Sequence, residues 1–73
     1  MLVYKERVNI DNKVKFYRKK ATLTQKELAG KVRISERNLQ SIEYGKQVPN
    51  VYTAILFAEA LQVSVKDLFP LPK

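Results

Sequence analysis

The sequence predicts an all-α fold of five short helices, and three observations support this prediction. Apolar residues recur at helical spacing along most of the chain. Residues that favour helix N-caps, such as Thr24 and Ser35, stand before several of these apolar segments. A chain of 73 residues has room for one domain with a small core. We therefore expect a single helical domain over residues 10–69, preceded by an N-terminal arm over residues 1–9 and followed by a tail over residues 70–73.

The N-terminal segment, residues 1–9, contains more apolar side chains than an ordinary disordered tail. We expect an extended arm that lies over the first helix, with a short strand and a frayed end as the alternatives. The first helix should run from Ile10 or Asp11 to Lys20. Phe16 lies off the apolar face of this helix, so the arm is expected to cover it. The residues that follow the helical period and should face the core are Ile10, Val14, Tyr17 and Ala21.

The central stretch Leu23–Gly45 predicts two short helices joined by a sharp turn. The first should span about Thr24–Val32, and Glu27 completes a capping box with its N-cap residue. The second should span about Ser35–Tyr44, with glycine placed to end it in the left-handed region. Only Arg33–Ile34 lies between them, so the connection must be tight. This is the geometry of a helix-turn-helix, whose second helix enters the major groove of DNA.

The C-terminal part of the sequence predicts two further helices. Asn50 is suited to cap a helix over Val51–Leu61. Ser64 is suited to cap a short helix over Val65–Phe69, which Pro70 would end. In the longer helix, the residues expected to face the core are Ala54, Ile55, Ala58 and Leu61, with Phe57 alongside.

Many positions between Ile10 and Phe69 fit one known pattern in consistent register. They are Leu23, Gln25, Glu27, Leu28, Ala29, Val32, Ile34, Ser35, Leu39, Ile42, Glu43, Gly45, Lys46, Pro49, Ala58, Ala60, Leu61, Val63, Ser64, Asp67, Leu68 and Phe69. The pattern resembles the lambda-repressor, Cro and XRE-like family of DNA-binding domains. The resemblance implies a five-helix lambda-repressor-like fold and sequence-specific binding of double-stranded DNA.

Two positions depart from the pattern of this family. Arg33 and Gln62 stand where the family usually has a glycine after a helix. A side chain in the left-handed region costs on the order of 1 kcal/mol. Either the chain tolerates this strain or its turns differ from those of the family, which leaves the angle of the recognition helix open.

The second helix of the motif should turn a polar face outward, because Leu39 and Ile42 face the core. An arginine there can pair with guanine O6 and N7, an amide with adenine, and a carboxylate with cytosine N4. Glu36 has the alternative role of orienting Arg37. The resemblance implies that Glu36, Arg37 and Ser41 do most of the reading and that Gln40 is variable. The expected base-reading residues are Glu36, Arg37, Asn38, Gln40 and Ser41.

Phosphate contacts are expected around that face. Free N–H groups at the start of the Thr24–Val32 helix favour an anion, and the resemblance implies that Gln25 binds a phosphate there and supports the recognition helix. The resemblance also implies a structural pair between Arg18 and Glu43; a phosphate contact is the alternative role for Arg18. The resemblance further implies backbone contacts by Tyr44, Lys46 and Gln47. The expected phosphate-binding residues are Gln25, Lys26, Arg33, Tyr44, Lys46 and Gln47.

An apolar pair on the fourth helix predicts self-association. Tyr52 and Leu56 are four residues apart, at positions that the family usually gives to polar residues. Together with Leu71 they form the expected dimer interface, with scattered surface apolar residues as the alternative. A homodimer would bind an inverted-repeat operator.

The composition limits the classes of partner and ligand that the protein is expected to bind. The net charge is +7, and five of the fourteen lysines and arginines lie between Lys13 and Lys20, which favours a polyanion such as duplex DNA. The chain has no histidine and no cysteine, so the usual zinc ligands are missing. No catalytic constellation is visible, and we expect no enzyme activity, cofactor or small-molecule ligand. No apolar run approaches the roughly 20 residues of a membrane span, and a cytoplasmic location fits this sequence.

The predicted function is therefore a sequence-specific DNA-binding transcriptional regulator of Cro/repressor or controller-protein type. A protein-interaction module on the same fold, antitoxin-like or an adaptor, is the alternative, although the basic surface and the polar reading face argue against it. RNA binding is a third reading, with Tyr44 alone as an aromatic group for base stacking.

Overall fold

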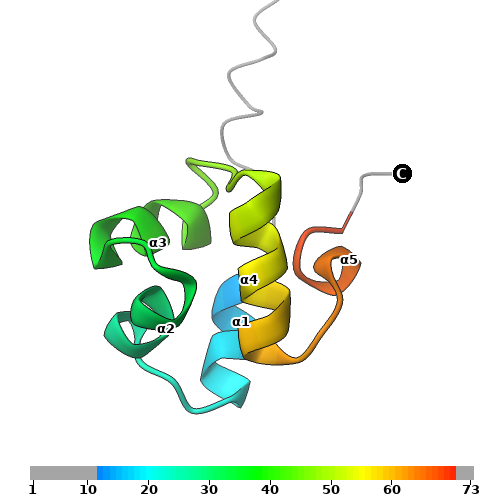
Figure 1. Cartoon of the computed structure of the whole chain (residues 1–73), viewed down its shortest axis with the longest axis horizontal. Helices are drawn as coiled ribbons and strands as arrows, with labels where there is room; N and C mark the ends of the chain where they lie inside the picture. Colours follow the sequence, from blue (N-terminus) through cyan, green and yellow to red (C-terminus); the bar gives the residue numbers. More distant parts are fainter. Residues whose placement is uncertain (1–11, 71–73) are drawn as a thin grey trace, which may run out of the picture.

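The computed structural model describes residues 12–70, which form five α-helices without a β-strand in that range. The helices are α1 (Val14–Lys20), α2 (Gln25–Val32), α3 (Glu36–Glu43), α4 (Val51–Leu61) and α5 (Val65–Leu68). Helices α1 and α4 occupy the middle of the domain, with α2 and α3 on one side and α5 on the other (Figure 1). None of the helices between residues 12 and 70 is long and apolar enough to cross a membrane. The predicted all-α, five-helix fold is confirmed.

Local capping residues set the start of four helices, as the sequence predicts. Thr24 and Glu27 form a reciprocal capping box at α2. The Ser35 hydroxyl accepts the Asn38 N–H at α3, and the Asn50 side chain accepts the Thr53 N–H at α4. A second capping box, between Ser64 and Asp67, starts α5. These side chains satisfy N–H groups that have no partner within the helix.

Helix α1 begins later than predicted, because the backbone just before it is held by other elements. The Asn12 side-chain nitrogen donates to the Ile42 carbonyl at 2.8 Å, while its oxygen accepts the Val14 N–H. The Lys13 N–H donates to the Leu68 carbonyl at 2.8 Å. These bonds replace a further turn of helix. The predicted positions Ile10 and Asp11, like the arm over residues 1–9, lie outside the described residues.

Four helices end with one residue in the left-handed region, and only one of these residues is glycine. The positive φ angles belong to Thr22 (58°), Arg33 (63°), Gly45 (81°) and Gln62 (59°). After Gly45, the Lys46 N–H returns to the Ser41 carbonyl at 2.9 Å, which is the hydrogen bond of a Schellman motif. Arg33 and Gln62 therefore keep the turn geometry of the family and tolerate the strain of a side chain there.

The core lies between all five helices. Phe57 of α4 is fully buried and packs edge-on against Phe69, with the ring centroids 6.5 Å apart. The buried apolar residues are Val14, Leu28, Ala29, Val32, Leu39, Ile42, Phe57, Leu61 and Leu68. Ala29 is small among these large side chains, and its small size allows α2 and α3 to approach closely.

Two predictions about the core are wrong. Ala21 ends α1 and is exposed, because the chain turns away after Lys20. Ile55 is 46% exposed. The buried stripe of α4 runs through Phe57 and Leu61 at i, i+4 spacing, and Ile55 lies to one side of this stripe. Phe16 is exposed within the described part of the chain, and the arm expected to cover it lies outside that part.

Candidate nucleic-acid interface

A buried ion pair ties the end of α3 to α1. Arg18 Nε donates to Glu43 Oε2 at 2.7 Å, and Arg18 Nη2 donates to Glu43 Oε1 at 3.3 Å. The third donor of the guanidinium group, Nη1, reaches the Leu23 carbonyl at 2.9 Å. The side chains of Arg18 and Glu43 are only 9% and 3% exposed. The pair expected from the sequence is therefore present in the structural role, and its burial argues against a phosphate contact by Arg18.

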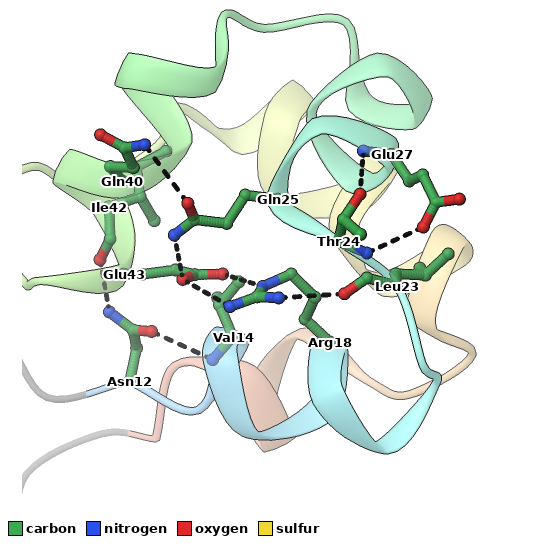
Figure 2. A network of polar contacts seen from close by, with 10 residues as sticks. All are labelled: Asn12, Val14, Arg18, Leu23, Thr24, Gln25, Glu27, Gln40, Ile42 and Glu43. Atoms are coloured by element: carbon green, nitrogen blue, oxygen red, sulfur yellow. Dashed lines mark hydrogen bonds and ion pairs between the residues drawn. The ribbon is translucent and has the colours of Figure 1, made fainter.

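The same carboxylate also fixes α2 against α3. Gln25, the first residue of α2, donates from Nε2 to Glu43 Oε1 at 3.0 Å. Its Oε1 accepts from Gln40 Nε2 at 3.2 Å, so one amide bridges the two helices (Figure 2). Asn12 adds a contact from the segment before α1 to the Ile42 carbonyl. Three parts of the chain thus hold α3 in one orientation, and Gln25 has the supporting role that the resemblance implies.

The outward side of α3 contains most of the expected base-reading residues. Glu36 and Arg37 are exposed on its first turn. Gln40 and Ser41 follow one turn later and are half-buried. Asn38 lies further round the helix, and its Oδ1 atom is buried without a hydrogen-bond partner. The structure therefore places four of the five residues on one polar face, while Asn38 is partly turned toward the protein.

The expected phosphate-binding residues stand at the start of α2, in the turn before α3 and just after α3. Lys26 is exposed on the first turn of α2, next to the half-buried Gln25. Arg33 is exposed in the turn between α2 and α3. Beyond the other end of α3 follow three exposed residues, Tyr44, Lys46 and Gln47.

Electrostatics around the start of α2 favour an anion. The backbone N–H of Thr24 donates to the Glu27 carboxylate at 2.8 Å, and this bond, together with the Thr24 hydroxyl and the nearby Lys31, lowers the pKa of Glu27. The Glu27 carboxylate is turned back on the helix end, and the exposed Lys26 beside it adds a positive charge. Among the described residues, no group of histidine, cysteine or acidic side chains is placed to hold a metal ion.

Sequence reasoning missed two contributors to this arrangement. Asn12 was not recognised as a tie between the start of α1 and α3, because its partner is a backbone carbonyl thirty residues away. The contact between Gln25 and Gln40 was also missed, since the resemblance implies support of the recognition helix by Gln25 without naming its partner, and Gln40 was considered only as a base contact. The inward positions of Leu39 and Ile42 place Gln40 on the outward side of the helix, but nothing local in the sequence indicates its partner on α2.

The fold defines a helix-turn-helix domain, with α2 as the first and α3 as the second helix of the motif. The Helix-turn-helix family model matches residues 14–68. A similar protein, an "uncharacterized HTH-type transcriptional regulator" of Methanocaldococcus jannaschii, is 38% identical over 58 residues, which covers 80% of this chain and 88% of the relative. The chain belongs to the Cro/C1-type helix-turn-helix family of DNA-binding transcriptional regulators.

Proposed function

We propose that the protein regulates transcription by binding an inverted-repeat operator as a homodimer, with α3 in the major groove of each half-site. The observation that supports this most directly is the rigid placement of α3. Its exposed first turn offers Arg37, while Glu43 at its other end is locked to α1 and α2 by buried hydrogen bonds. A reading helix that is held in advance loses little conformational freedom on binding. Cations and amides on both sides of α3 supply the phosphate contacts that position it.

The experiment that tests this proposal compares a base reader with a phosphate contact. A cognate duplex is first selected from a random pool with the purified protein. Arg37→Ala should weaken binding to that duplex by about 1–3 kcal/mol and relax the preference at one base pair per half-site. Lys46→Ala should weaken cognate and random duplexes by the same factor and reduce the salt dependence of binding.

Three outcomes would contradict these assignments. If Arg37→Ala weakens both duplexes equally, Arg37 contacts a phosphate rather than a base. If the protein selects no sequence, the operator proposal is wrong. If it shows no salt-dependent binding to duplex DNA at all, the protein-interaction alternative on the same fold gains support.

The proposed dimer uses an exposed apolar face of α4. Val51 is 75% exposed, Tyr52 is 62% exposed, and Ile55 follows on the same side of the helix. Leu56, expected in the interface together with Tyr52, is half-buried and packs against the core, so it would contribute at the edge of this face. Leu71 lies outside the described residues. A contiguous apolar surface on so small a domain favours burial against a second copy.

Sedimentation tests this assembly. Ile55→Lys introduces a charge into the α4 face without removing a core side chain, and it should give a monomer with a lower melting temperature and weaker operator binding. Val65→Lys, at an exposed apolar residue of α5, is the matched control and should remain dimeric. A dimer of unchanged stability in the Ile55→Lys variant would place the interface elsewhere.

A further inference from the structure

Hydrogen bonds lead from the buried ion pair to the reading face of α3, and each step has a fixed direction. Arg18 has only donors, and an ionised Glu43 has only acceptors. Both Glu43 oxygens receive N–H groups of Arg18, at 2.7 and 3.3 Å. Oε1 then receives a further donor, Nε2 of Gln25, at 3.0 Å. The buried carboxylate therefore determines which end of the Gln25 amide faces it.

The orientation of the Gln25 amide in turn determines the orientation of the Gln40 amide. An amide has its donors on the nitrogen and its acceptor on the oxygen, so turning Gln25 around would place two oxygens against each other. With its nitrogen on Glu43, Gln25 offers Oε1 to α3, where Gln40 Nε2 donates to it at 3.2 Å. The orientation of both amides thus follows from the donors and acceptors of their partners.

The carbonyl oxygen of Gln40 is consequently turned away from α2. Figure 2 shows the nitrogen of Gln40 toward Gln25 and its oxygen on the opposite branch of the amide. Gln40 lies one turn after Glu36 and one turn before Tyr44, and both of these neighbours are exposed. It therefore stands in the middle of the outward side of α3, with an acceptor at its free end.

We propose that Gln40 presents this oxygen to the major groove as a fixed acceptor and selects an amino base over a keto base. In that groove adenine N6 and cytosine N4 are donors, whereas guanine O6 and thymine O4 are acceptors that would face the Gln40 oxygen unfavourably. Gln25 and Glu43 act as positioning residues that set the direction of the amide. This inference rests on the proposed function, and it names the class of base that one residue of the reading face recognises.

The test uses binding of duplexes that differ at one base pair. That position is identified as the one at which Gln40→Ala relaxes the selected sequence. The unmodified protein should bind duplexes with adenine or cytosine there about five- to tenfold more tightly than those with guanine or thymine, which is the low end for one direct base contact. Gln25→Met removes the bridge and frees the Gln40 amide, so this ratio should fall to about twofold or less.

Glu43→Gln provides a sharper variant because it should reverse the direction. The carbonyl of the new glutamine should take the place of Oε2, which receives the shorter bond, from Arg18 Nε at 2.7 Å. Its nitrogen then replaces Oε1, gives up the 3.3 Å bond from Arg18 Nη2 and donates to Gln25. Gln25 would then turn around and donate to the oxygen of Gln40, which leaves the Gln40 nitrogen outward. The expected result is a preference for guanine or thymine. Lys26→Met, on the next residue of α2, is the control; it should weaken all duplexes alike and leave the ratio unchanged.

Each result separates this inference from the proposed function. Circular dichroism establishes at which temperature each variant is folded, and binding is compared there; if Glu43→Gln does not fold, Gln25→Met decides the question. Four results would overturn the inference while operator binding stands. The unmodified protein could prefer a keto base, or no position could respond to Gln40→Ala. The ratio could stay unchanged in Gln25→Met, or the preference could fail to reverse in a folded Glu43→Gln. If the unmodified protein shows no sequence preference at all, the proposed function itself is contradicted.

Discussion

Replacing Glu43 by leucine should destabilise the domain more than any surface substitution, because it leaves Arg18 buried without its counter-ion. The Arg18 side chain is 9% exposed, and two of its three hydrogen bonds go to Glu43. Removing one partner of a buried, hydrogen-bonded pair costs about 3–5 kcal/mol. A domain of this length has a free energy of unfolding of roughly 4–11 kcal/mol, so the variant would lose a large part of its stability.

The double variant distinguishes the pair from simple loss of packing. Arg18→Met should be comparably destabilising, since it removes two bonds to Glu43 and the bond to the Leu23 carbonyl. Combining Arg18→Met with Glu43→Leu removes both charges and leaves apolar side chains of similar volume. Such replacements are often neutral or stabilising, so the double variant should recover most of the loss.

Thermal unfolding followed by circular dichroism measures both effects. A loss of about 3 kcal/mol corresponds to a fall of at least roughly 12 °C in melting temperature for a domain of this size. Added salt should change the difference little, because a buried pair is screened less than an exposed one. Glu59→Leu, at an exposed acid on α4, should stay within about 0.5 kcal/mol. If Glu43→Leu costs less than about 1 kcal/mol, the reasoning from burial is wrong.

Two further predictions concern the ends of the helices. Thr22→Gly and Gln62→Gly should each raise the free energy of unfolding by about 0.5–1 kcal/mol, because both residues have positive φ angles. The gain should be larger at Thr22, which is β-branched. A lower melting temperature in either variant would argue against backbone strain at that residue. Glu27→Ala should destabilise the domain at neutral pH. The pKa of Glu27 is lowered in the folded state, so its contribution is complete above the unfolded pKa and is lost as pH falls through the folded pKa. Melting curves of both proteins should therefore converge in acid, and a difference that persists at low pH would refute this assignment.

The boundaries of α2, α3 and α4 could be predicted from the sequence because local residues determine them. Thr24, Ser35 and Asn50 accept N–H groups only three residues away, and Gly45 ends α3 with hydrogen bonds inside the same turn. Interactions of this range are encoded by residue type and spacing. The start of α1 could not be predicted in this way, because it depends on bonds from Asn12 to distant elements.

The register of α4 shows a second limit of sequence reasoning. Its sequence is apolar almost all round, so periodicity alone does not decide which stripe is buried. The structure buries Phe57 and leaves Ile55 and Val51 on the surface. The larger side chain fills the space between the helices, and the choice follows from the shape of the core. The sequence indicates Tyr52 as part of the apolar face proposed for dimerisation, but Val51 and Ile55 could be recognised as its other members only once the helices were packed.

The residues of the reading site were predictable as a set, but their mutual orientation was not. Sequence identifies Gln25, Gln40 and Glu43 as polar groups of one motif, whereas the order of donors and acceptors among them requires three helices to meet. This arrangement gives Glu43 two consequences that substitutions can separate. Leucine removes the charge and the acceptor, so stability falls and the Gln25 amide loses its fixed direction. Glutamine retains an acceptor for Arg18 but turns the amides of Gln25 and Gln40 around. The preference between amino and keto bases should therefore reverse, in a domain that keeps more of its stability.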